Sequence, residues 1–104
     1  MRKIIYVSAL ALAIAGAASA TVLPSGFKGA HLGAMAKVSL TTARATALAA
    51  RAGVITDQEL ETEKGGSGLR YSFDIKSAGK SFEVGVDAKT GRLLENGAEG
   101  PNAD

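Results

Sequence analysis

Residues 69–87 read LRYSFDIKSAGKSFEVGVD, two alternating segments around a short turn. In both segments apolar side chains occupy every second position, and most residues between them are polar. This alternation is typical of half-buried antiparallel strands. Segments 69–76 and 81–87 are therefore predicted to form a hairpin with one apolar side, made of Leu69, Tyr71, Phe73, Ile75, Phe82, Val84 and Val86.

The register of this hairpin follows from parity, because residues directly opposite each other must share a face of the sheet. A two-residue turn at Ala78-Gly79 makes every cross-strand pair on one face apolar, and each such pair stabilises by roughly 0.2–1 kcal/mol. A four-residue loop gives the same pairs, so the turn type stays open. The predicted pairs are Ile75 with Phe82, Phe73 with Val84, and Tyr71 with Val86.

A helix is predicted before the hairpin, over residues 38–52. Its apolar residues recur at spacings of three and four and are mostly alanine, which favours a helix and a close approach to a sheet. Ser39 or Thr41 is expected to cap its start, because either hydroxyl can accept a hydrogen bond from a free backbone N–H. Gly53 is expected to end it in a left-handed conformation.

The strand predicted over residues 56–63 carries a row of carboxylates on one side, namely Asp57, Glu59, Glu61 and Glu63. Pairing Glu63 with Arg70 would set Asp57 opposite Lys76 and Glu59 opposite Asp74. Calcium needs six to eight oxygens around one point, and side chains two apart on a strand are about 7 Å apart. The row is therefore interpreted as a solvated face, with docking of a basic partner as the functional alternative and cation binding as a weaker one.

A turn and a short strand follow the hairpin. The Asp87 side chain is expected to accept hydrogen bonds from backbone amides two residues on, and Gly91 to take the positive φ that closes the turn. Residues 92–95 would then form a fourth strand. The predicted fold class is α+β, one helix packed on a three- to four-stranded antiparallel sheet.

Three stretches together resemble the PepSY domain family. They are the helix opening VSLTTA at 38–43, the aromatic strand YSFDI at 71–75, and FEVGVDAKTGRLL at 82–94. The last is the most specific, and Gly85 stands where the family more often has a larger residue. The resemblance covers residues 37–95 and implies a non-catalytic module of the kind found in propeptides of secreted peptidases and in small envelope proteins. It carries over no catalytic residue, and Asp87 and Gly91 match its turn.

The ends of the chain differ in composition from this central part. Residues 1–20 have two cations, an apolar run and a small-residue end at Ala20, the pattern of a signal peptide cleaved before Thr21. Residues 21–36 are rich in glycine and are predicted to be a flexible leader, and residues 96–104 a disordered tail. The expected location is therefore periplasmic or secreted, with no stable membrane insertion after cleavage.

Composition narrows the function further. The chain has twelve basic and ten acidic residues, and Arg2 and Lys3 would be removed with the signal peptide, so the remaining chain has equal numbers of both. Neither nucleic acid nor an anionic membrane is therefore an expected partner. The chain has no cysteine, and its one histidine, His31, lies in the leader, where no third group would orient it as a base. No enzyme activity, cofactor or metal is predicted. The expectation is an interaction module that binds or inhibits an exported protein, with small-ligand or divalent-cation binding as the alternative.

Overall fold

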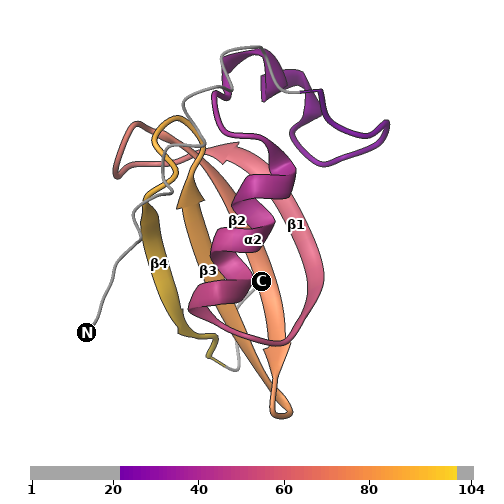
Figure 1. Cartoon of the computed structure of the whole chain (residues 1–104), viewed down its shortest axis with the longest axis vertical. Coiled ribbons are helices and arrows are strands. Elements are labelled where there is room, and N and C mark those ends of the chain that lie inside the picture. The colour runs from indigo at the N-terminus through magenta and orange to yellow at the C-terminus, as the bar shows by residue number, and fades with distance from the viewer. Residues whose placement is uncertain (1–21, 101–104) are drawn as a thin grey trace, which may run out of the picture.

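The computed structural model describes residues 22–100, in which one helix packs on a four-stranded antiparallel sheet (Figure 1). The predicted α+β class is confirmed. The helix, α2 (Leu40–Ala50), lies along one face of the sheet, and the described residues place no helix on the other. The predicted signal peptide, residues 1–20, is outside the described residues. In spatial order the strands are β1 (Val54–Thr62), β2 (Leu69–Ser77), β3 (Lys80–Asp87) and β4 (Leu93–Ala98).

The hairpin of β2 and β3 has the predicted register, with all three apolar pairs in place. Ala78 and Gly79 have φ values of 52° and 80°, so the connection is a two-residue turn with two left-handed residues. Such a turn matches the twist of the strands that it joins. The Tyr71 hydroxyl donates a 2.7 Å hydrogen bond to the carbonyl of Val38, which satisfies this buried polar atom in the core.

Helix α2 begins after Ser39, whose hydroxyl accepts a 3.1 Å hydrogen bond from the Thr42 amide. Its sheet-facing side is built on Ala43 and Ala47, both fully buried. The predicted left-handed end at Gly53 is wrong, because the helix ends at Arg51 in an extended conformation. Gly53 serves a different need: a Cβ there would lie 2.3 Å from the Lys76 carbonyl oxygen. No helix in residues 22–100 is long and apolar enough to cross a membrane.

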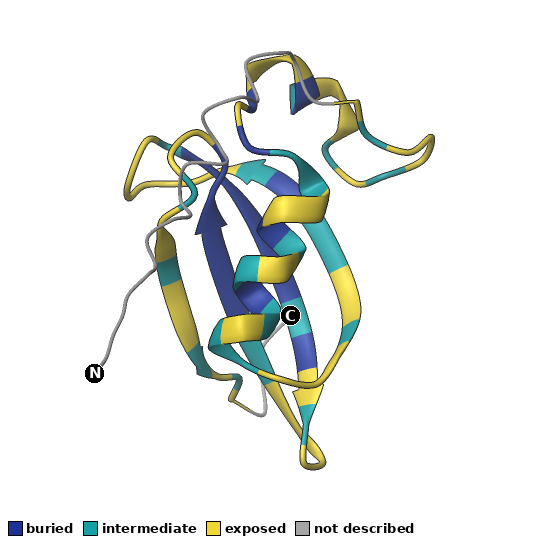
Figure 2. Ribbon diagram, in the orientation of Figure 1, coloured by how far each residue is buried: buried dark blue, intermediate teal, exposed yellow. Residues whose placement is uncertain are grey.

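The core lies between α2 and the two central strands, which are the most deeply buried elements (Figure 2). The outer strands β1 and β4 are much more exposed. Burial of apolar surface contributes roughly 25 cal/mol per Å², so β2 and β3 carry most of the stabilisation. The buried apolar residues are Ala36, Val38, Ala43, Ala47, Leu60, Leu69, Tyr71, Phe73, Ile75, Val84, Val86 and Ala88.

The segment before the helix is ordered where it is described, contrary to the prediction of a flexible leader. Residues 30–35 form a short 3₁₀ helix, η2 (Ala30–Met35), and Ala36 is 2% exposed. Leu23, Phe27 and Leu32 pack against the core. Together with Ala36, these residues are spaced irregularly between glycines and show neither helical nor strand periodicity. The sequence pattern therefore predicted no structure in this segment.

Two further predictions need correction. Strand β4 continues through Ala98, so the prediction of a disordered tail is wrong for residues 96–98. The pairing of β1 with β2 is offset by two residues: Glu61, not Glu63, lies opposite Arg70, and Asp57 lies opposite Asp74. The β1–β2 loop sets this offset, because the Glu63 amide bonds to the Gly68 carbonyl and so closes the loop after Thr62. An offset of two keeps the same face, so the carboxylates stay on the predicted side.

Candidate functional site

The sheet face opposite α2 gathers carboxylates from all four strands. Three rows of cross-strand partners run over this face, through 57–74–83–97, 59–72–85–95 and 61–70–87. Glu99 joins them through its amide, which bonds to the Ser81 carbonyl. We call this surface the acidic face. Among residues 22–100, the acidic side chains that lie at least partly exposed on it are Asp57, Glu59, Glu61, Asp74, Glu83, Glu95 and Glu99, whereas Asp87, at the end of the third row, is buried.

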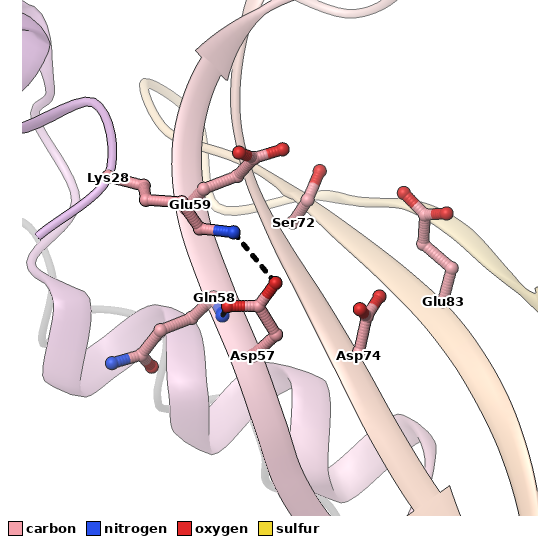
Figure 3. Close-up of a pocket in the computed structure, with 7 residues that line it drawn as sticks. All are labelled: Lys28, Asp57, Gln58, Glu59, Ser72, Asp74 and Glu83. Carbon is pink, nitrogen blue, oxygen red and sulfur yellow. Dashed lines mark hydrogen bonds and ion pairs between the residues drawn. The ribbon is translucent and has the colours of Figure 1, made fainter. Parts of the chain in front are cut away.

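Among residues 22–100, three cations share the acidic face, and two of them are held in ion pairs. Lys28 reaches over β1 from the segment before η2, and its Nζ lies 2.7 Å from Oδ2 of Asp57 (Figure 3). The hydrogen bond with Asp57 raises the pKa of Lys28, and the same bond lowers the pKa of Asp57. Both side chains are about half exposed, so this pair contributes little to stability. Lys76, opposite Ser81, is exposed at the edge of the face.

Three carboxylates of the acidic face converge, those of Asp74, Glu83 and Glu99, with one oxygen of each lying within 4.8 Å of the others. Partial burial and the charges of Glu95 and Asp74 raise the pKa of Glu83 to about 7. A hydrogen bond with Asp74 raises the pKa of Glu99. The group therefore holds a proton near neutral pH, and a cation placed beside it would replace that proton.

Asp74 and Glu83 also line a shallow pocket of about 160 Å³. Its remaining lining residues come from β1, from β2 and from Lys28, and Figure 3 shows their carboxylates pointing to the same side of the sheet. The pocket is almost entirely polar in its lining. It suits a charged side chain or ion better than an apolar ligand.

Arg70 is the third cation of the acidic face and the one that is buried. Its guanidinium lies over Gly85 on β3 and its Nη1 lies 3.0 Å from Oε1 of Glu95 on β4. A Cβ at position 85 would be 2.9 Å from that Nη1, so the absence of a side chain at Gly85 makes room for the arginine. The glycine that departs from the PepSY pattern is therefore explained by packing. Arg70 Nε has no hydrogen-bond partner among residues 22–100.

The predicted turn after β3 is present, and it is more elaborate than expected. Oδ1 of Asp87 accepts hydrogen bonds from the Lys89 and Thr90 amides at 2.8 and 3.0 Å, and Gly91 has φ 83°. Ser67, in the distant β1–β2 loop, donates to the same carboxylate through both its amide and its hydroxyl. Burial alone would raise the pKa of Asp87, but these four hydrogen bonds outweigh it and lower the pKa to about 2. The role of Asp87 is to tie two loops together at one end of the sheet.

The residues weighed for other chemistry lie apart from the acidic face. His31 is exposed on η2. Tyr71 and Phe73 are fully buried in the core, as predicted, whereas Phe82 is half buried beneath the guanidinium of Arg51, whose Cζ lies 3.8 Å from the ring centre. Within residues 22–100, His31 makes no side-chain hydrogen bond or ion pair and is not part of the carboxylate group on the acidic face.

The sequence prediction found three of the seven carboxylates of the acidic face. Glu63, the fourth residue of the predicted row, lies in the loop just past β1. The residues that it missed are Asp74, Glu83, Glu95 and Glu99. The alternation of apolar and polar residues in β2 and β3 places Asp74 and Glu83 on the side away from the core, so the sequence pattern could have identified these two. Glu99 could not be placed, because β4 was predicted to end at Glu95.

Comparison with known proteins gave one match. The family model described as "Peptidase propeptide and YPEB domain" matches residues 37–96. The searches of curated proteins and of solved structures returned no match.

Proposed function

Because the chain belongs to the PepSY family, we propose that it is an exported, non-catalytic interaction module that docks a basic surface of another extracytoplasmic protein on its acidic face. PepSY domains are generally non-catalytic modules of the propeptide or inhibitor type, typically extracellular or periplasmic. A peptidase is the natural first candidate for the partner, since inhibition or assisted folding of a peptidase is the activity of propeptides in this family.

The observation that carries the proposal is the separation of charge between the two sides of the sheet. The acidic face has seven carboxylates and three cations, two of which are paired within it. On the other side, α2 and its C-cap contribute Arg44 and Arg51 and no carboxylate. Such a surface field attracts a partner of opposite charge and accelerates its encounter.

The test is binding of the mature protein, residues 21–104, to proteins of an envelope extract at low and high salt. The charge-reversal variant Glu59→Lys should lose the captured partner, because Glu59 belongs to the acidic face and lines the same pocket as Asp74 and Glu83. The matched control is Ala45→Lys/Ala49→Lys, which adds the same net charge on the exposed side of α2. Retention of the partner by Glu59→Lys, or equal loss in the control, would contradict docking on the acidic face.

Divalent-cation binding is a second candidate, favoured by the approach of Asp74, Glu83 and Glu99. Three carboxylates can supply up to six oxygens, the lower limit for calcium. Calorimetry with calcium alone distinguishes the two candidates. Binding that is abolished in Glu83→Gln supports the cation, whereas the absence of heat and of any shift in melting temperature removes it.

A further inference from the structure

The two edges of the sheet are not equivalent. At the β1 edge, the Leu60 amide donates a 2.9 Å hydrogen bond to the Lys28 carbonyl, so the segment before η2 covers part of the strand. Contact there is tight: a Cβ at Gly29 would lie 1.8 Å from the Leu60 carbonyl oxygen. An irregularity between Ile55 and Asp57 further breaks the strand. Coverage and bulges are devices that prevent a sheet edge from pairing with another chain.

Among the described residues, the β4 edge has neither device along Glu95–Ala98, and its own irregularity lies just before this stretch, opposite Gly85 and Val86. Its pairing with β3 is regular from Phe82 to Gly85. The Glu99 amide points inward, since it bonds to the Ser81 carbonyl. Because bonding direction alternates along an antiparallel strand, the backbone N–H groups of Asn96 and Ala98 point outward, away from β3. Residues 22–100 supply no strand beyond β4.

The side chains along β4 specify what an added strand could carry. On the acidic face, such a strand would run beside Glu95 and Glu99, with Gly97 leaving room between them. On the helix side it would run beside Asn96, whose Oδ1 accepts a 3.1 Å hydrogen bond from Arg51 Nε. Cations are therefore favoured at alternate positions facing the carboxylates and disfavoured at the positions facing Arg51.

We infer that β4 is a site for β-strand addition, and that its occupant is an extended segment of a partner protein with lysine or arginine at every second residue. This inference rests on the proposed function, and it specifies that the basic partner binds through an extended segment. Backbone pairing with Asn96 and Ala98 supplies affinity, and alternate side chains supply specificity. A second copy of this chain is a poor occupant, since pairing two β4 strands would bring the Glu95 and Glu99 carboxylates of both copies together on one face.

The probe is a synthetic peptide, KTKTKTKT, which can place all four lysines on one face of a strand. The control peptide, KKTTKKTT, has the same composition but turns half of its lysines toward Arg51. The test variant is Ala98→Pro, which removes an outward N–H while leaving the inward bonds to β3 intact. The matched variant is Ala98→Val, which changes the same exposed position and keeps the N–H.

We expect the alternating peptide to bind the mature protein at least tenfold more tightly than the control peptide. Ala98→Val should bind like the unchanged protein, and Ala98→Pro at least tenfold more weakly. On binding, hydrogen exchange at the Asn96 and Ala98 amides should slow in the unchanged protein, a readout that remains if Ala98→Pro is unstable. Equal binding of both peptides, equal binding by both variants, or unprotected amides would each refute strand addition. If the Glu59→Lys result of the proposed function still holds in that case, docking on the acidic face stands and only the edge site falls.

Discussion

Replacing Asp87 by asparagine tests how the two loops at one end of the sheet are held. The carboxylate is 1% exposed and accepts four hydrogen bonds, two of them from Ser67. Its pKa is lowered from 3.8 to about 2, and each pKa unit corresponds to about 1.36 kcal/mol, so ionisation of Asp87 stabilises the fold by about 2 kcal/mol. In Asp87→Asn, the amide nitrogen would face the Ser67 N–H, which leaves two donors opposed.

The pH dependence of this loss has a defined sign. A depressed native pKa gives stability that is present above the unfolded value of about 3.8 and lost as pH falls toward about 2. Unfolding of Asp87→Asn should therefore require about 2 kcal/mol less than the unchanged protein at pH 7, and the difference should shrink between pH 4 and pH 2. Urea denaturation followed by tyrosine fluorescence or circular dichroism at several pH values measures it.

Glu63→Gln is the control, since this exposed carboxylate lies in the β1–β2 loop with Ser67 and makes no side-chain hydrogen bond or ion pair within residues 22–100. It should change the free energy of unfolding by less than about 0.5 kcal/mol. A difference for Asp87→Asn that stays constant from pH 7 to pH 2, or one below about 0.5 kcal/mol at pH 7, would show that the carboxylate charge does not hold the loops together.

Three other variants test the sheet and the helix. Gly85→Ala should lower the free energy of unfolding by about 1–3 kcal/mol by overpacking against Arg70, whereas Gly97→Ala, which has nothing within 4 Å of its Cβ, should cost little; thermal denaturation compares them. Glu83→Gln should have the same free energy of unfolding as the unchanged protein below about pH 4.5. Above pH 8 it should be more stable by about 1 kcal/mol, because a native pKa of about 7, above the usual 4.5, means that ionisation of Glu83 costs stability, and its partial exposure to solvent reduces that cost; urea denaturation at both pH values checks the sign. Ser39→Ala removes the N-cap bond and should cost about 1 kcal/mol with a loss of helical signal by circular dichroism, and an unchanged melting temperature would contradict the cap.

The central hairpin could be predicted from the sequence because two independent signals agree there. Alternation set the buried face, and the short turn at Ala78-Gly79 left only registers of one parity. The same parity rule placed Asp57, Glu59 and Glu61 on the correct face of β1. It could not fix their partners, because the longer glycine-rich loop permits offsets of two residues without moving any side chain to the other face.

Contacts that depend on distant segments were beyond the reach of local patterns. The prediction that residues 21–36 form a flexible leader failed because Phe27 and Leu32 are held by the sheet and not by any local period. The hydrogen bonds from Ser67 to Asp87 join residues that are 20 positions apart, and nothing in the local sequence around either residue predicts that they meet. The acidic face has the same origin, since its charge is the sum of four strands that each carry only one to three carboxylates.

The separation of charge has an energetic consequence for binding. Opposite charges facing each other across strands stabilise a sheet, and like charges destabilise it, so a face that sets Asp57 beside Asp74 and Asp74 beside Glu83 gives up stability. The chain has enough lysine and arginine to balance these carboxylates, yet α2 and its C-cap hold arginines on the opposite side. A basic partner on the acidic face would relieve the repulsion and replace the proton held by the group of Asp74, Glu83 and Glu99. Protons and the partner therefore compete for one surface, and docking should weaken as pH falls below the Glu83 pKa of about 7.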